Sequence, residues 1–319
     1  MNTMKWLLKR EFWEHKGSFF WAPVILGMVM VAVTGITVVY GMSSGHSVFK
    51  LNLNGEMQNM KAMFAAMSPE DHRQTMGVLS NICLGAGLPL MMMLAVTTFF
   101  YCLGALHDER RDRSILFWKS LPLSDTQTVL SKVAMVTVAA PLIALAVSLA
   151  TSLALMLIIG TVAMFHGLNV FGGILGNRGV YMLPLQVIGV LPVYLLCALP
   201  TVGWLLLVSS WARSKPFLWA VGVPLIALIL VKWVGYLLGM SSAASWLMSN
   251  VAGRMLLGLV PGSWLFDHNR AGAVLREPGI DLLAQAWPTL ATPGVWIGAA
   301  AGVLMIYGAM RLRRFKDEG

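Results

Sequence analysis

Six apolar runs in this chain are each long enough to cross the ~30 Å hydrocarbon core of a bilayer as a helix. They cover residues 19–40, 78–106, 133–164, 183–211, 217–239 and 294–310. A backbone inside lipid must pair its N–H and C=O groups within itself, so isolated runs of this kind fold as helices. The sequence therefore predicts an all-α, polytopic membrane protein with six transmembrane helices, formed as a single domain over residues 1–319.

The composition agrees with a chain dissolved in lipid. Hydrophobic residues make up 57% of the sequence and charged residues only 12%, which is far from the soluble globular average. The formal net charge of +9 does not indicate nucleic-acid binding, because the basic residues sit at the ends of apolar runs and form no stripe interleaved with aromatic residues. That placement is typical of membrane topology.

The distribution of Lys and Arg predicts both termini in the cytoplasm. With the N-terminus inside, the inner segments hold fifteen of these residues and the longer outer segments hold seven. Residues 241–260 form a further apolar stretch, but a seventh span there would place the basic residues 311–316 outside. We therefore expect a re-entrant or surface-lying outer helix between the fifth and sixth spans.

The outer segment before the second span carries helix signals. Ser68 and Pro69 are a typical helix start, so we expect the second helix to begin near Pro69 and to kink at Pro89. Four methionines ahead of it recur at helical spacing and predict a short amphipathic helix: Met57, Met60, Met63 and Met67. Such a face rests on lipid or a neighbouring helix, or grips a hydrophobic ligand.

A polar island, residues 107–132, interrupts the apolar runs between the second and third spans. Its charged start is followed by four large apolar residues, Ile115 to Trp118, and then by Pro122, which ends a helix. Ser124 is expected to cap the next one. Exposing the apolar patch to water would forfeit roughly 1.5–3 kcal/mol per side chain. It therefore lies in the lipid interface or fills a groove on a partner.

The island resembles the cytoplasmic loop of type-2 ABC export permeases. The residues that carry the resemblance are Glu109-Arg110, Ser114-Ile115-Leu116, and Leu121 to Ser124 leading to Lys132. The stretches 9–19 and 311–318 resemble the ends of the same family. The family pattern usually has a glycine before the hydroxyl residue, and Arg113 holds that place here.

The resemblance implies that residues 113–120 form a cytoplasmic coupling helix seated on a separate ATPase, which is present in two copies. It also implies a second permease subunit, identical or different, in a bacterial inner membrane. ATP and Mg would bind the ATPase, and this chain would hold no cofactor. The residues assigned to ATPase coupling are Glu109, Arg110, Arg113, Ile115, Leu116, Phe117, Trp118 and Pro122.

Missing motifs narrow the function further. The sequence contains no GxxxxGK[ST], HExxH or GxSxG pattern, so we expect no ATP hydrolysis or other enzymatic activity in this chain. All 14 acidic residues lie outside the six predicted spans, which disfavours an ion-coupled transporter. We therefore expect an ATP-driven exporter subunit for a hydrophobic or amphiphilic substrate: peptide, lipid-like or drug-like. The alternative is a membrane scaffold or signalling subunit that binds an ATPase without moving substrate.

Three smaller features remain. Gly294, Gly298 and Gly302 let two helix backbones approach closely, either inside one subunit or between subunits. Lys232 is the one charge within a predicted span and either snorkels to the interface or contacts substrate. The three cysteines lie in apolar runs and the six histidines lack metal-ligand spacing, so we expect no metal site.

Overall fold

The computed structural model describes residues 3–43, 50–53, 56–59, 83, 85–113, 124–165, 171–172, 176, 178–239, 253–263 and 282–315. Six helical segments in this part are long and apolar enough to span a membrane, which confirms the predicted number. They are Gly17–Thr37, Leu88–Arg111, Asp125–Phe165, Val180–Trp211, Pro216–Leu237 and Pro293–Arg314. The chain is therefore a multi-pass membrane protein.

The first half of the chain forms α1 (Thr3–Glu14), a π-helical segment (Gly17–Trp21), α2 (Ala22–Ser43), α5 (Leu88–Gly104), α6 (His107–Arg111) and α8 (Asp125–Ala134). A second π-helical segment (Met135–Ala139) joins α8 to α9 (Ala140–Phe165). The second half forms α11 (Arg178–Trp211), α12 (Pro216–Leu237), α14 (Arg254–Leu257), α17 (Leu282–Ala286), a 3-10 segment (Trp287–Ala291) and α18 (Pro293–Phe315).

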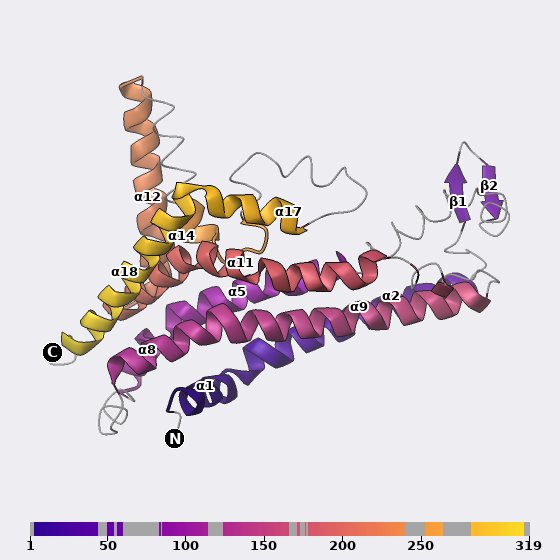
Figure 1. Cartoon of the computed structure of the whole chain (residues 1–319), viewed down its shortest axis with the longest axis horizontal. Coiled ribbons are helices and arrows are strands. Elements are labelled where there is room, and N and C mark those ends of the chain that lie inside the picture. The colour runs from indigo at the N-terminus through magenta and orange to yellow at the C-terminus, as the bar shows by residue number, and fades with distance from the viewer. Residues whose placement is uncertain are drawn as a thin grey trace.

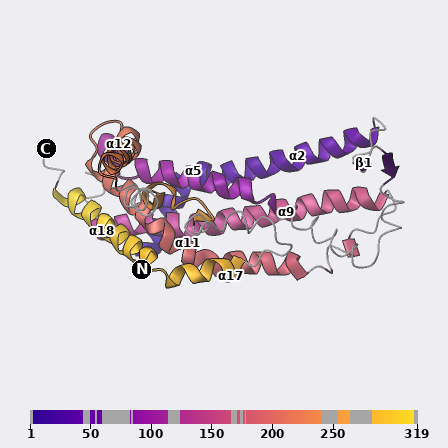
Figure 2. The same cartoon turned by 90° about the horizontal axis from the view of Figure 1, so that it is seen from above.

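Four long helices, α2, α5, α9 and α11, run alongside one another (Figures 1 and 2). The starts of α1 and α8 and the end of α18 gather at one end of this bundle (Figure 1). α12 leaves the bundle at that end and stands across it, and Figure 2 shows it nearly end-on. The described ends of the polar island, α6 and α8, therefore lie at the same end as the first and last helices.

A small hairpin corrects the prediction for the first outer segment. β1 (Lys50–Leu53) pairs antiparallel with β2 (Glu56–Asn59), with Lys50 opposite Asn59 and Leu53 opposite Glu56. Met57 is therefore in a strand and not in a helix. The residues between the strands in the sequence are Asn54-Gly55, the pair most typical of tight hairpin turns. Met60, Met63 and Met67 lie outside the described residues.

The described part of the second span contains a break, and its predicted start at residue 78 lies outside the described residues. A turn at Ala86–Gly87 precedes α5, whose first residue is Leu88. Pro89 is the second residue of α5 and lies just after that turn, and Cys83 and Gly85 before the turn are also helical. The kink at Pro89 stays a prediction. The predicted continuous helix from Pro69 to Leu106 is thus interrupted, and residues 69–82 lie outside the described part.

The core of the bundle is concentrated at the end that carries the polar island. Buried side chains there come from α5, α8, α11 and α18, among them Cys102, Val129, Leu205, Leu206 and Ala309. Phe19 in the first π-helical segment packs edge-on against Tyr101 of α5, with ring centroids 5.1 Å apart. By contrast, most large apolar residues of α2 and α12 are exposed on this single chain. Those surfaces suit a lipid environment.

Residues 253–263 are the described part of the segment expected to be re-entrant or surface-lying. α14 within it is only four residues long. The hydroxyl of Thr201 in α11 donates to the Arg254 carbonyl at 2.7 Å and accepts from the Gly258 amide at 3.1 Å. This contact places α14 beside the interior of a candidate span. Residues 241–252 lie outside the described part.

Candidate functional site

The polar island is described at both of its ends. α6 follows α5 after a turn at Ala105–Leu106, and α8 begins at Asp125. The Ser124 hydroxyl accepts a hydrogen bond from the Gln127 amide at 3.3 Å, so the predicted N-cap is confirmed. Residues 114–123 lie outside the described part, and with them five of the predicted coupling residues: Ile115, Leu116, Phe117, Trp118 and Pro122.

Glu109, at the centre of α6, points into the molecule. Only about 9% of its side chain is exposed. One carboxylate oxygen, Oε1, lies 3.0 Å from Nζ of Lys132 in α8, and the other, Oε2, lies 2.7 Å from a guanidinium nitrogen of Arg313 in α18. Both cations are themselves almost fully buried. Glu109 thus joins the start of the island to its end and to the last helix.

Lys132 also reaches the first helix. Its Nζ lies 3.0 Å from Oε1 of Glu11 in α1, and Glu11 is fully buried. The other Glu11 oxygen, Oε2, accepts a hydrogen bond of 2.7 Å from the hydroxyl of Tyr101 in α5. Burial alone would raise the pKa of Glu11, but Lys132 and the Tyr101 hydroxyl outweigh it and hold that pKa below its ordinary value. Glu11 is therefore ionised at neutral pH.

Arg313 closes the arrangement. Besides Glu109, its guanidinium contacts the carboxylate of Asp125, with Nε 3.1 Å from Oδ1. Asp125 is the first residue of α8, where a negative charge also complements the helix dipole. We call Glu11, Glu109, Asp125, Lys132 and Arg313 the ion-pair cluster. It contains three carboxylates and two cations, and it ties together α1, α6, α8 and α18.

The energetic meaning of the cluster follows from its burial. Desolvating two ions is costly, so a buried ion pair adds little net stability compared with well-packed apolar residues. Removing one partner from such a pair is different, because the remaining charge is left buried and typically costs about 3–5 kcal/mol. The cluster therefore acts chiefly to specify one arrangement of these four helices and to penalise any movement that separates them.

A second set of contacts fixes α6 to α11. The Ser209 hydroxyl accepts hydrogen bonds from the backbone amides of Leu106 and His107, each at 3.0 Å. The guanidinium of Arg110 donates to the carbonyls of Ser209 and Ala212 at the end of α11. A cation there also favours the helix dipole. Arg110, like Glu109, is engaged within this chain.

Arg113 has an unusual backbone conformation. Its φ is +56°, in the left-handed region that favours glycine. This is the position at which the resembled family usually has a glycine. The backbone at Arg113 thus has the conformation a glycine would adopt without strain, and the arginine side chain is exposed. The assignment of Glu109, Arg110 and Arg113 to ATPase coupling stays a prediction.

The glycine stripe of α18 is occupied by α11 of the same chain. A Cβ added to Gly302 would lie 2.5 Å from the Leu199 carbonyl, and one added to Gly298 would lie 3.3 Å from Pro200. Gly294 faces the Arg254 side chain instead, at 3.1 Å. Of the two arrangements that the spacing allowed, these contacts correspond to packing inside one subunit.

Sequence reasoning missed most of the ion-pair cluster. Lys132 and Arg313 entered it only as charges that orient the chain and as part of the family resemblance, and Glu11 was given no role of its own. A signal existed in α1, because Glu11 follows Leu7 by one helical turn and shares its buried face. Pairing it with Lys132 needed the fold, since 121 residues separate them.

The cluster holds no arrangement suited to a metal. Within the described residues no group of three or more His, Cys, Asp or Glu side chains is placed to ligate an ion. Its carboxylates pair with Lys and Arg side chains, and these ion pairs hold the helices together. Lys232 lies on α12 and is exposed.

No known family model, curated protein or solved structure matches this chain.

Proposed function

We propose that this chain is the membrane-spanning permease subunit of an ATP-driven exporter of the type-2 ABC class, energised by a separate ATPase. In this proposal both termini and the polar island face the cytoplasm, in a bacterial inner membrane. The ATPase binds ATP and Mg, and two permease subunits, identical or different, form the export path. The cargo is hydrophobic or amphiphilic, in keeping with a chain that places no carboxylate within its predicted spans.

The observation that supports the proposal best is the mechanical attachment of the island. Glu109 and Lys132 bracket it in the sequence and contact each other at 3.0 Å, and Arg313 and Glu11 bind them to the last and first helices. A partner that pushes on residues 114–123 would therefore act on a segment whose two ends are fixed to the first and last helices. Such a loop suits force transmission better than a loop that merely connects two helices.

Force would pass from that segment along two routes. α8 continues without a break through the second π-helical segment into α9, forming one helical segment from Asp125 to Phe165. The second route runs through Arg110, whose hydrogen bonds to the Ser209 and Ala212 carbonyls connect α6 to the end of α11. Both helices cross the bundle, so movement of the island would tilt them together. The distribution of Lys and Arg supports a cytoplasmic position for this end.

A co-purification experiment tests the partnership. Phe117→Ala with Trp118→Ala should lose the ATPase, because truncating large aromatics at a desolvated contact commonly costs about 2 kcal/mol or more each. The matched control is Arg111→Ala with Asp112→Ala, since both of these side chains are exposed and surface charges contribute about 0–1 kcal/mol. Pull-down of the ATPase at equal membrane expression compares the two. Full retention by the aromatic variant would contradict the proposed contact.

Two further results would refute the exporter proposal. ATP hydrolysis by the purified chain alone would place the nucleotide site in this chain. A bound ATPase whose activity responds to no amphiphile, including short lipids and hydrophobic peptides, would favour the scaffold hypothesis.

A further inference from the structure

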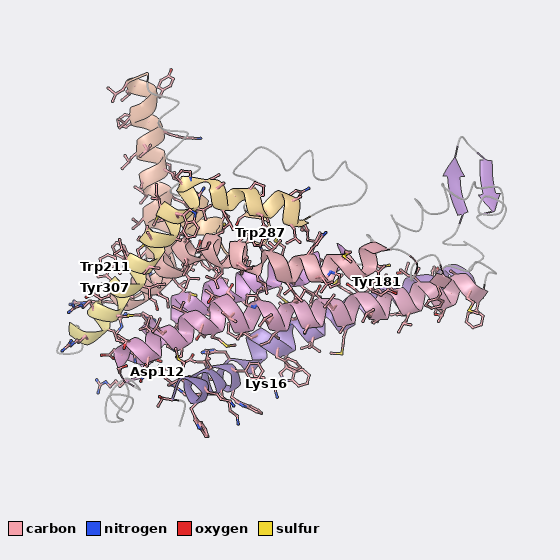
Figure 3. All side chains as sticks on the ribbon, viewed as in Figure 1. Lys16, Asp112, Tyr181, Trp211, Trp287 and Tyr307 are labelled. Carbon is pink, nitrogen blue, oxygen red and sulfur yellow. The ribbon has the colours of Figure 1, made fainter. Side chains whose placement is uncertain are left out.

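α1 has two faces of opposite character. Leu7 and Glu11 are buried against the bundle, whereas Trp6, Lys9 and Trp13 are exposed. About 60% of each of these two tryptophans is accessible, although indole rings seldom stay in water without a partner. Figure 3 shows the side chains on this side of α1 projecting away from the bundle, with Lys16 at the junction with the first span.

The exposed face carries a repeated pair. Lys9 follows Trp6 by three residues and Lys16 follows Trp13 by three, so each lysine lies one turn from its tryptophan. The Lys9 ammonium lies 5.7 Å from the centre of the Trp6 ring, and the Lys16 ammonium lies 4.8 Å from that of Trp13. Lys16 is also 5.8 Å from the Trp21 ring. All three distances lie within the range of cation–π attraction.

No carboxylate in the described part of the chain neutralises the positive charge of this face. The acidic residues of α1 are already engaged, Glu14 by Arg10 at 3.2 Å and Glu11 by Lys132. Within the described residues, Lys9 and Lys16 form no ion pair. One side of each ammonium group faces an indole ring. The N–H donors on its other side can bind an acceptor. An anion with several oxygens could accept from these donors.

The position of α1 indicates where that anion comes from. The first candidate span begins at Gly17, the residue directly after Lys16, and Trp21 belongs to its first turns. Trp13, Lys16 and Trp21 therefore lie at the membrane edge, where indole rings settle between headgroups and acyl chains. Because a 12-residue helix is only ~18 Å long, Trp6 can lie at the same level when α1 follows the surface.

We propose that the exposed face of α1 binds the headgroups of anionic phospholipids through two Trp–Lys sites, Trp6 with Lys9 and Trp13 with Lys16. The ammonium of each site would bind the lipid phosphate while the indole covers the glycerol and upper acyl region. The inference does not rest on the proposed exporter function. It requires only that the chain lies in a membrane.

Native mass spectrometry of the full-length protein tests the proposal. The protein is exchanged into equimolar phosphatidylglycerol and phosphatidylcholine with matched acyl chains, and the ratio of the two lipids retained is measured. We expect the wild type to favour phosphatidylglycerol. A basic residue near an anionic surface contributes about a fivefold preference, so Lys9→Gln with Lys16→Gln should lower the ratio by about fivefold or more.

Three variants separate these sites from diffuse charge attraction. Arg213→Gln with Lys215→Gln removes two exposed charges from the loop before α12 and should change the ratio less than twofold. Lys9→Arg with Lys16→Arg keeps both charge and ring contact and should retain the preference. Trp6→Leu with Trp13→Leu keeps apolar bulk but removes the ring faces, and should lower it.

Several outcomes would overturn the proposal. A wild type with no preference would mean that another partner, such as a soluble protein, covers this face. An equal loss in the α1 and loop double variants would show that only net charge matters. Retention of the full phosphatidylglycerol preference by the tryptophan variant would also show that the ring faces make no contribution. Size-exclusion profiles and unfolding midpoints of every variant confirm that the comparison is between folded proteins.

Discussion

Lys132 and Glu11 contact each other at 3.0 Å although 121 residues separate them in the sequence. Both side chains are almost completely buried, and each has a second polar contact, Lys132 with Glu109 and Glu11 with Tyr101. The first helix of the chain is therefore held to the helix that follows the polar island by a desolvated charge pair.

Lys132→Met should destabilise the protein by about 3–5 kcal/mol, because it leaves two carboxylates near each other in the interior with one cation fewer. The thermal unfolding midpoint in detergent measures the effect. Lys5→Met, on the exposed face of α1, is the matched control and should change stability by less than about 0.5 kcal/mol. Adding Glu11→Gln to Lys132→Met should cost less than the sum of the single changes, because the two residues share one interaction.

Acidification should expose the contribution of Glu11. A carboxyl group whose pKa is lowered by folding adds stability above its unfolded pKa, near 4.5, and that stability is lost as the pH falls through the folded pKa. Glu11→Gln should therefore be less stable than wild type at pH 7, and the difference should shrink below pH 4.5. Glu14→Gln, which removes an exposed carboxyl group from the same helix, is the matched control. A constant difference at all pH values would contradict this assignment.

Gly302→Ala should destabilise the crossing of α18 over α11 by about 1–3 kcal/mol, because the new Cβ meets backbone atoms of Leu199 and Pro200 that cannot rotate away. Gly222→Ala in α12 is the control. A Cβ there meets nothing within 4 Å, and alanine is the better helix former by roughly 0.5–1 kcal/mol. Unfolding midpoints should therefore move in opposite directions. Tolerance of Gly302→Ala would show that the two helices are farther apart.

Arg113→Gly should stabilise the protein relative to Arg113→Ala by about 1–2 kcal/mol, because only glycine adopts φ near +56° without a steric penalty. Both variants remove the exposed side chain, so their difference reports the backbone alone. Equal unfolding midpoints would mean that the left-handed turn is absent in solution. Comparing ATPase co-purification by the same pair separates the shape of this turn from the charge of the arginine.

The number of spans could be predicted from hydropathy because lipid imposes length and composition directly on each helix. Their ends were harder to predict. Residues 78–106 form one apolar run, yet Gly85, Gly87 and Pro89 divide it, and Pro89 at the second position of α5 marks a helix start. Hydropathy alone does not indicate the turn at Ala86–Gly87, which these local residues mark.

The ion-pair cluster shows why the candidate site was only partly predictable. The rule that places Lys and Arg on the cytoplasmic side uses the position of each charge and ignores its partner. It accounts for Lys132 and Arg313 equally well whether they are solvated or buried. Only the packing of α1, α8 and α18 brings Glu11, Glu109 and Asp125 within reach of these cations. Similarly, the four-residue spacing in α18 could not identify α11 as the helix that fills it.

The contact between Glu109 and Arg313 also sets an order of events during synthesis. The two residues are 204 positions apart, and at ~5–20 residues per second the ribosome needs about 10–40 s to make the intervening chain. Once Lys132 has been made, Glu109 has this cation for the rest of the interval but lacks its second one. Nascent chains that stop before the last helix would keep an undercompensated acid at the membrane edge, which offers a membrane protease or chaperone a mark of incompleteness. Arrival of Arg313 removes that mark, so this end of the bundle is complete only after α18 has been made.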